Sequence, residues 1–256
     1  MTDPLKVMLV AGEASGDALG AGLARSLRRR LGDDRVRFVG LGGSKMAAEG
    51  VRSPFDISEL SVLGLAELVT AAPRVLRRVA QTVRQAMDER PDVVVLIDSW
   101  GFTIRVAEGI RRRAPDMALV KYVAPQVWAH HPARAKVLAR AVDHLLTIHG
   151  FEAPLFEAEG LPTTFVGNSV LSRDISGADG ARLRAQIGAG PDDPVLLILP
   201  GSRPSEIQRM MAPFEDAAAR LKEARPDLQL VVVAADTVAD LVKGRVAGWR
   251  HKAHVV

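Results

Sequence analysis

The chain has 256 residues, of which 48% are hydrophobic and 4% aromatic, enough apolar side chains for one large or two modest domains. Its 34 basic and 30 acidic side chains leave a formal charge of +4, which is compatible with an anionic substrate or membrane surface and requires neither. The low aromatic content argues against a nucleic-acid partner, and the absence of cysteine excludes disulfides and thiolate chemistry. The sequence shows neither a signal peptide nor an apolar run long enough to span a membrane, which predicts a cytoplasmic protein.

The first predicted strand ends in a turn of small and polar residues. Residues 7–11 form an uninterrupted apolar run, typical of a strand buried on both faces, and a helical pattern follows to about Leu31. We expect Ser15 or Asp17 to cap that helix. Because ligands bind at the carboxyl ends of parallel strands, the turn is a candidate wall of a binding site, although a plain strand–helix connection fits the spacing equally well. The turn consists of Gly12, Glu13, Ala14, Ser15, Gly16 and Asp17.

A second strand, predicted at residues 36–41, also ends in glycines, at Gly42 and Gly43. Further on, residues 61–72 are largely apolar, with Glu67 as the only charge, and Pro73 is predicted to open a long helix to about Arg90. Four arginines fall near one face of that helix, at positions 74, 77, 78 and 84. An apolar segment beside a basic stripe favours a contact with a membrane surface or acyl chains, whereas a core helix followed by a solvated one is the plainer alternative.

Strands and helices then alternate along the chain. Strands are predicted at residues 91–98, 117–123, 143–149 and 163–166, with helices at 102–113, 132–141 and 151–159. This order predicts a doubly wound parallel sheet. Asp98 ends the most apolar of these strands, so its carboxylate is a candidate general base. The competing interpretation is that Asp98 or Ser99 caps the following helix.

Composition changes over residues 168–194, where glycine, serine, aspartate and proline surround one short helical pattern. We therefore predict an N-terminal domain over residues 1–170 and a linker with a second domain over 171–256. The second domain reads as strand 195–199, helix 205–225, strand 228–234, helix 236–246 and the beginning of a strand at 253–256. The second domain has only three predicted strands, and the last of them is incomplete. This predicts a partial Rossmann-like domain, which is either truncated relative to related proteins or covered at its sheet edge by another element.

The turn between residues 199 and 206 is the second candidate site. Gly201 permits a tight turn, Pro204 suits a first helical turn, and Ser202 or Ser205 is expected to cap the helix. The helix amides and the Arg203 guanidinium would suit a phosphate or diphosphate, whereas a capped helix with a surface arginine is the alternative. The histidines lack metal-ligand spacing, so the sequence predicts no metal site.

Several of these motifs together resemble the lipid-A-disaccharide synthase family, inverting glycosyltransferases of GT-B architecture. The matching stretches cover residues 10–17, 39–43, 60–65, 97–99, 122–129, 165–167 and 199–203, with Met46, Gly50 and Glu206. The resemblance extends over essentially the whole chain. It implies an α/β fold of GT-B type, with a doubly wound N-terminal domain that binds the acceptor and an incomplete second domain that binds the nucleotide sugar.

The resemblance also implies a reaction. The family transfers 2,3-diacylglucosamine from UDP to 2,3-diacylglucosamine 1-phosphate on the cytoplasmic face of the Gram-negative inner membrane, as a peripheral protein without metal or cofactor. By this resemblance Asp98 is the base and Arg203 the diphosphate-side arginine. Substrate contacts are expected from the small and polar residues of the matching turns: Gly12, Glu13, Ser15, Gly16, Asp17, Gly42, Gly43, Gln126, Trp128, Asn168, Gly201, Ser202 and Glu206.

The chain departs from the family pattern in four places, one of which is the pair His130-His131 after Trp128-Ala129. Trp100-Gly101 follows Asp98-Ser99 where the family usually has proline, Asn168-Ser169 replaces a usual His-Pro, and the later C-terminal segments that grip the uridine are absent from the sequence. Two alternatives to the synthase therefore stay open. One is a non-catalytic homologue that binds the lipid or sugar phosphate, and the other is a different GT-B enzyme that uses a UDP-sugar.

Overall fold

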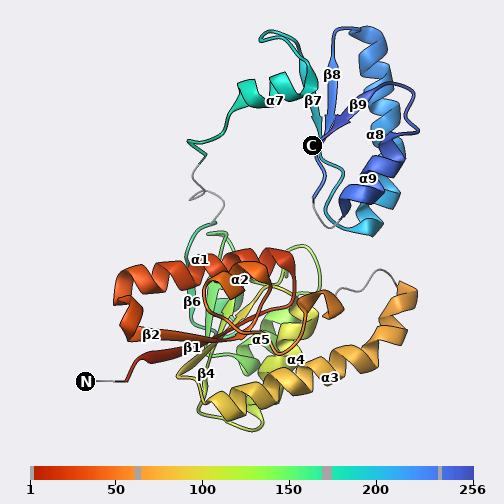
Figure 1. Cartoon of the computed structure of the whole chain (residues 1–256). Coiled ribbons are helices and arrows are strands. Elements are labelled where there is room, and N and C mark those ends of the chain that lie inside the picture. Colours follow the sequence, from red (N-terminus) through yellow and green to blue (C-terminus); the bar gives the residue numbers. More distant parts are fainter. Residues whose placement is uncertain (1–2, 61–64, 169–174, 236–237) are drawn as a thin grey trace. The chain divides into compact units, whose positions relative to one another are not determined.

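The computed structural model describes residues 3–60, 65–168, 175–235 and 238–256, and for residues 65–71 it describes the backbone alone. The chain divides into two compact units (Figure 1). The first contains the strands up to Phe165 and the second the residues from Ile175 onward.

The first unit is built on a six-stranded parallel sheet with the strand order β2-β1-β3-β4-β5-β6. All six strands were expected from the sequence, and their parallel pairing confirms the predicted doubly wound class. The strands are β1 Leu5–Ala11, β2 Val36–Leu41, β3 Val93–Ile97, β4 Ala118–Tyr122, β5 His144–Thr147 and β6 Thr163–Phe165.

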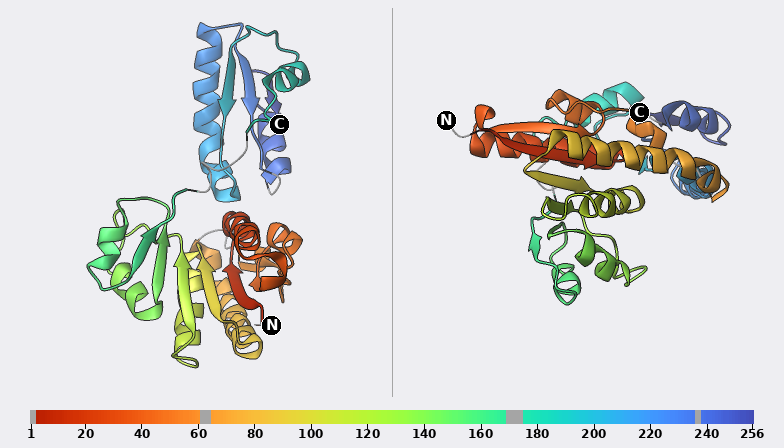
Figure 2. Two further views of the ribbon diagram at one scale, coloured as in Figure 1. Left: turned by 90° about the vertical axis from the view of Figure 1, so that its left-hand side faces the viewer. Right: turned by 90° about the horizontal axis from the view of Figure 1, so that it is seen from below.

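Helices cover both faces of this sheet (Figure 2). Along β1 alternate side chains enter different cores: Val7 and Leu9 pack with α1 and α2, whereas Met8 and Val10 pack with α3, α4 and α5. Burial on both faces explains why the strands are apolar runs without alternation. The helices are α1 Ala14–Leu31, α2 Ser44–Ala48, α3 Leu65–Glu89, α4 Trp100–Arg111, α5 Arg134–Ala141 and α6 Ala153–Glu157, with short 3-10 turns at Asp33–Arg35 and Ile57–Leu60.

The prediction that Pro73 opens a helix is wrong, because α3 begins at Leu65 and Pro73 lies inside it. Leucine, alanine and glutamate dominate residues 65–72, and these strong helix formers offset the one backbone hydrogen bond that a proline cannot donate. Residues 61–64 and the side chains of 65–71 lie outside the described part, so the predicted acyl or membrane contact of the apolar segment is untested.

The predicted arginine stripe on α3 is shorter than expected. Arg78 turns toward the protein: it donates to Glu59 at 2.7 and 3.0 Å, and its guanidinium lies 4.5 Å from the centre of the Phe55 ring. A bidentate, stacked arginine is fixed in place and unavailable to a membrane. Arg74, Arg77 and Arg84 are exposed, so the basic stripe consists of these three residues.

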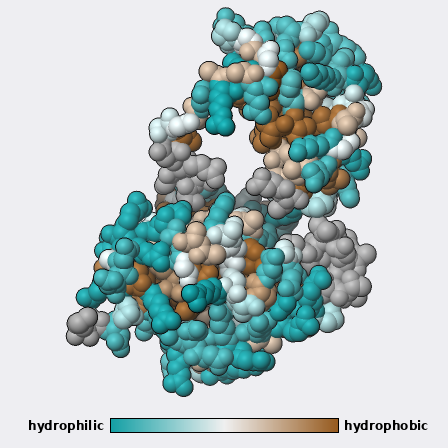
Figure 3. All heavy atoms as spheres, viewed as in Figure 1, coloured by the Kyte–Doolittle hydropathy of each residue, from teal (hydrophilic) through white to brown (hydrophobic). Residues whose placement is uncertain are grey.

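The second unit has a three-stranded parallel sheet of order β7-β8-β9. The last strand confirms the strand predicted to begin at Ala253. Leu197 and Leu199 are 52% and 68% exposed, and Figure 3 shows hydrophobic surface gathered beside β7 and β9. The elements are α7 Gly180–Ile187, β7 Val195–Ile198, α8 Pro204–Ala224, β8 Gln229–Val232, α9 Ala239–Val246 and β9 Ala253–Val255. Within the described residues, no helix is both long and apolar enough to cross a membrane.

Candidate functional site

The structure brings the turn after β1 against the end of β3. The Ser15 hydroxyl donates to the Asp98 carboxylate at 3.2 Å. A side chain at Gly12 would place its first carbon 2.9 Å from the Ser99 hydroxyl, and one at Gly16 would lie 3.4 Å from the Ile97 carbonyl oxygen. The glycines of this turn therefore let α1 approach the strand end closely enough for Ser15 to reach Asp98.

Neither Ser15 nor Asp17 caps α1, which corrects the expectation from the sequence. The helix begins at Ala14, with Glu13 in the N-cap position and no side-chain hydrogen bond to its first turn. Because the helix begins earlier than Ser15, both side chains belong to its first turn and face other elements. Ser15 faces Asp98, whereas Asp17 is 4% exposed and faces α2.

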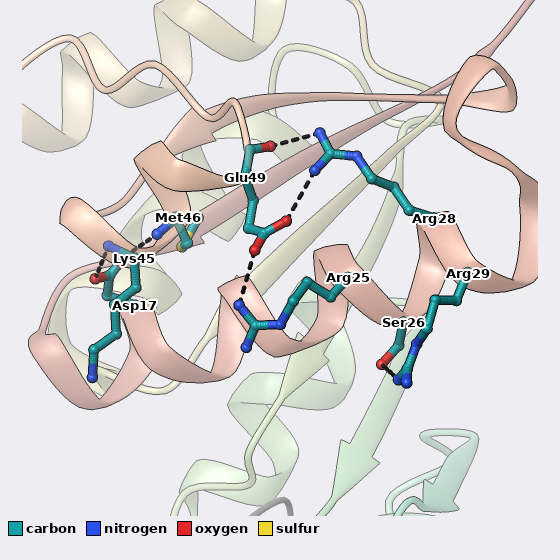
Figure 4. Close-up of polar contacts among 8 residues, drawn as sticks. All are labelled: Asp17, Arg25, Ser26, Arg28, Arg29, Lys45, Met46 and Glu49. Carbon is teal, nitrogen blue, oxygen red and sulfur yellow. Dashed lines mark hydrogen bonds and ion pairs between the residues drawn. The ribbon is translucent and has the colours of Figure 1, made fainter.

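Asp17 caps the neighbouring helix α2 instead (Figure 4). Its two carboxylate oxygens accept from the backbone N–H groups of Gly43, Lys45 and Met46 at 2.8, 3.0 and 2.9 Å. A side chain at Gly43 would come within 2.8 Å of the carboxylate, so this position needs glycine. The Gly42 N–H donates to the Ser53 hydroxyl at 2.7 Å. These bonds give Asp17 and the glycine turn a role in the fold, and their substrate contacts stay predictions.

The other end of α2 is tied to α1 by an ion-pair cluster, also drawn in Figure 4. The Glu49 carboxylate accepts a hydrogen bond from each of the Arg25 and Arg28 guanidinium groups, both at 2.9 Å. The second terminal nitrogen of Arg28 donates to the Glu49 backbone carbonyl at 2.8 Å. The Glu49 side chain is only 13% exposed, so this contact is better shielded than an ordinary surface pair. Both ends of α2 are thus fixed to α1.

Asp98 and Ser99 form a turn in an unusual backbone conformation. Their φ angles are +48° and +41°, a left-handed pair that costs each residue on the order of 1–3 kcal/mol. Helix α4 begins at Trp100 with Ser99 in the N-cap position, and neither side chain makes a capping bond. The capping interpretation of Asp98 is therefore wrong. Its carboxylate is turned toward Ser15 and away from the helix it precedes.

A buried lysine on the neighbouring strand β4, Lys121, holds this turn by hydrogen bonds. Lys121 is 2% exposed, and its ammonium donates to the Asp98 carbonyl oxygen and, at 2.9 Å, to the Thr103 hydroxyl. Burial lowers the pKa of Lys121 from 10.5 to about 7, against the attraction of the Asp98 charge. The sequence analysis missed Lys121, although a charged residue in an otherwise apolar buried strand is itself a signal.

The loop after β4 adds an aromatic surface at the same edge of the sheet. Gln126 is exposed and Trp128 is 51% exposed. The ring centroid of Trp128 lies 5.6 Å from that of Phe151 in an edge-to-face contact, and Phe151, which follows β5, stacks on His149 with ring centroids 5.5 Å apart. Val123, at the start of this loop, has a φ of +73°, a strained value for a β-branched residue. Asn168 is half-buried after β6 in the same unit.

The second predicted site lies in the other unit, before α8. Arg203 occupies the N-cap position, and the capping bonds come from Glu206, which accepts from the N–H groups of Ser202 and Arg203 at 2.8 and 3.1 Å. The expectation that Ser202 or Ser205 caps the helix is therefore wrong. Pro204 occupies the first helical position, and the side chain of Glu206 reaches back to the backbone N–H groups that precede the helix. Gly201 has a φ of +118° and is packed against Glu206.

Arg203 is well placed to meet an anion. Its guanidinium is 62% exposed and its ion pair with Glu206 is long, at 3.3 Å. An exposed pair of this kind contributes little to stability. Glu206, however, already accepts two of the backbone N–H groups that a diphosphate would use.

Replacing Glu206 with alanine is expected to lower the free energy of unfolding by about 1 kcal/mol at pH 7. Hydrogen bonds from the Ser202 and Arg203 N–H groups lower the pKa of Glu206 below 4.5, so its stabilising effect is present above pH 4.5 and is lost as the pH falls through the lowered value. Urea unfolding of Glu206→Ala at pH 7 and pH 3 checks this. Glu223→Ala on the same helix, 60% exposed, is the control, and an equal loss for Glu206→Ala at both pH values contradicts the assignment.

Within the described ranges, no group of three or more histidine, aspartate or glutamate side chains is arranged to hold a metal ion. The candidate site of the first unit thus consists of a carboxylate, a hydroxyl, a buried ammonium and exposed aromatic rings at one sheet edge. Such a set can exchange a proton with a hydroxyl group and bind a sugar face. The arginine turn of the second unit is a separate candidate.

A family model described as lipid-A-disaccharide synthetase matches residues 7–243. The chain belongs to this family. Curated lipid-A-disaccharide synthases from Paramagnetospirillum magneticum and Rhodospirillum centenum are 45% and 43% identical to it, over 98% and 96% of this chain. The chain spans 64% and 61% of the length of those two relatives. Membership in the family confirms the resemblance found in the sequence.

Solved structures confirm the fold class of this family member. A UDP-GlcNAc 2-epimerase from Neisseria meningitidis, bound to UDP-GlcNAc, superposes with a TM-score of 0.67, covering 98% of this chain and 72% of that one. The two sequences are 12% identical, so the likeness concerns the fold alone. The predicted α/β fold of GT-B type, with a partial second sheet, is therefore correct.

Proposed function

We propose that the chain is the acceptor-binding and part of the donor-binding portion of a glycosyltransferase that makes the lipid A disaccharide. The reaction joins UDP-2,3-diacylglucosamine to 2,3-diacylglucosamine 1-phosphate and releases UDP. The observation that carries the proposal is the match to the lipid-A-disaccharide synthetase family over residues 7–243, which includes the Asp98 turn and the Arg203 turn.

Asp98 is the proposed base. The acceptor hydroxyl oxygen forms a bond to the anomeric carbon of the donor, its proton passes to the Asp98 carboxylate, and the bond to the UDP oxygen breaks with its electron pair on the diphosphate. A base needs an oxygen that is free to accept, and Asp98 uses its carboxylate neither for a helix cap nor for an ion pair that would neutralise it within the described contacts. The Ser15 hydroxyl fixes the direction of the carboxylate.

Arg203 is the proposed partner of the departing diphosphate. A guanidinium binds phosphate oxygens in a bidentate manner, and charge placed where the leaving group develops its own lowers the barrier. Support for a nucleotide-sugar site in this fold comes from the structural neighbour that contains UDP-GlcNAc. The exposed Trp128 and Phe151 rings suit a sugar face or acyl chain of the acceptor.

We further propose that the protein works at the surface of the inner membrane. Its substrates carry acyl chains, and the exposed arginines of α3 follow an apolar segment in the sequence. Basic residues beside apolar ones favour contact with anionic lipid, a contact that weakens with salt. The proposal predicts a peripheral protein that binds anionic vesicles.

The test is UDP release by the purified chain from UDP-2,3-diacylglucosamine, with the acceptor present and absent. The proposal expects acceptor-dependent release together with a disaccharide 1-phosphate product identified by mass. Acceptor binding with no release would favour the non-catalytic binding homologue. Release without acceptor, or conversion of the donor sugar itself, would favour another GT-B enzyme that uses a UDP-sugar.

A further inference from the structure

We propose that Lys121 is a positioning residue for Asp98: from the apolar interior its ammonium fixes the Asp98–Ser99 turn through the Asp98 carbonyl oxygen. The role of Asp98 as base rests on the proposed function, whereas the coupling between the two residues rests on the contacts alone. The inference adds to the site a residue that touches neither sugar.

The turn is held through its backbone. The Asp98 N–H donates to the Tyr122 carbonyl at 2.9 Å, and the Asp98 carbonyl accepts from the Lys121 ammonium and from the Thr103 hydroxyl at 2.8 Å. The Ser99 carbonyl accepts from the Thr103 N–H at 3.0 Å. The partners of the turn in all of these bonds lie on β4 or α4, so the left-handed pair is fixed by these two elements. Backbone strain of this kind persists only where surrounding bonds determine it.

The surroundings of Lys121 make its charge effective. The residues around its side chain are apolar: Leu96, Trp100, Ile104, Ala107, Leu138 and Val142. In register with Lys121 lie Leu96 of β3 and Leu145 of β5. On the helices packed there, Arg105 of α4 is exposed, and the guanidinium of Arg134 of α5 lies over the Trp100 ring, 5.3 Å from its centre. Asp98 is therefore the charged group that acts on the ammonium.

Burying an ammonium in this way opposes folding. A lysine that lowers the stability of the native state is not explained by a purely structural role. Because the pKa of Lys121 falls from 10.5 to about 7, the unfolded chain binds more protons between these pH values. The stability of the native state therefore rises as the pH increases from about 7 to 10.5. Replacement with methionine, which has similar length and no charge, removes this dependence and is expected to leave the protein as stable or more stable at pH 6.

Kinetics of Lys121→Met give the first test. We expect kcat for disaccharide formation to fall about tenfold to a hundredfold with KM for both substrates unchanged, because a misplaced base slows the chemical step while the buried ammonium touches no substrate. The wild-type rate should titrate with a midpoint near 7, as Lys121 loses its proton, and the variant should lack that step.

Two further variants keep this test specific. Lys6→Met is the matched control, because the Lys6 ammonium also donates to a backbone carbonyl, that of Glu89 at 2.6 Å, at the amino end of the same sheet. It should leave kcat and its pH profile unchanged. Thr103→Val removes the second donor without removing the charge, so it should lower kcat but keep the step near pH 7. If Lys121→Met has an unchanged kcat and a higher free energy of unfolding, the buried lysine only destabilises the protein, and the proposal is overturned.

Nuclear magnetic resonance decides the coupling even if the chain forms no disaccharide. In the purified full chain, the ε-carbon of Lys121 and the carbonyl carbon of Asp98 should titrate with one shared midpoint near 7. In Lys121→Met the Asp98 carbonyl step should vanish, and in Lys6→Met it should persist. An Asp98 carbonyl that shows no step at the Lys121 midpoint overturns the positioning role, whereas absence of turnover in the wild type overturns only the proposed reaction.

Discussion

Replacing Asp98 with asparagine is expected to lower the rate of disaccharide formation by about a hundredfold to ten-thousandfold, with little change in KM. An amide cannot take the proton of the acceptor hydroxyl, and general base catalysis contributes this order of magnitude. The substitution keeps the side chain's shape and still offers an oxygen to the Ser15 hydroxyl, so the turn should hold. The measurement is initial-rate kinetics of UDP release with saturating donor and varied acceptor.

Asp116→Asn is the control for this substitution, because Asp116 is exposed and precedes β4 in the same unit. Its kinetics should equal those of the unmodified chain. Unfolding curves of both variants should also overlay the unmodified one. Near-normal turnover by Asp98→Asn would remove Asp98 as the base, whatever the family resemblance implies.

Replacing Asp17 with alanine is expected to lower the free energy of unfolding by about 2–4 kcal/mol. Three backbone N–H groups at the start of α2 would lose their acceptor in a buried place, and each unsatisfied buried donor costs about 1–3 kcal/mol before relaxation. Because the same contact fixes the turn after β2, the variant should also loosen Gly42 and Gly43. Urea unfolding at pH 7 measures the loss, and hydrogen exchange of the Gly43 amide locates it.

An exposed aspartate provides the comparison. Asp88→Ala on α3 should change the free energy of unfolding by less than about 0.5 kcal/mol, because its side chain faces solvent. Asp17→Asn should fall between the two, since the amide retains one acceptor oxygen but turns an NH2 toward a backbone donor. A loss in Asp17→Ala no larger than in Asp88→Ala would contradict the capping role.

The elements that the sequence predicts well are those whose signal is local. Residues 93–97 are five consecutive apolar side chains, and such a run between helical patterns leaves little choice but a strand covered on both faces. The same holds for β1, whose residues 7–11 are also an uninterrupted apolar run. The final strand was predicted over residues 253–256, and β9 occupies Ala253–Val255. Their alternation with helices determines the parallel order, because the crossovers must be helical.

The errors arose where a distant partner decided the outcome. Asp17 reads as a cap for its own helix, and only the fold brings α2 within reach of its carboxylate. The error at Pro73 is of another kind, because the signal against a helix start there was local: the residues before it are helix formers. Lys121 reads as an ordinary strand residue, because the acceptors that its ammonium finds on Asp98 and Thr103 are separated from it by 23 and 18 positions.

A crystal structure of the chain with 2,3-diacylglucosamine 1-phosphate would test the role of Asp98 most directly. It requires only that the acceptor bind, so it does not depend on turnover or on the second unit. We predict that the reacting hydroxyl oxygen of the acceptor glucosamine lies about 2.6–3.2 Å from a carboxylate oxygen of Asp98, beside Ser15. An acceptor bound with that hydroxyl against a different side chain, or away from the carboxyl edge of the first sheet, would contradict the account.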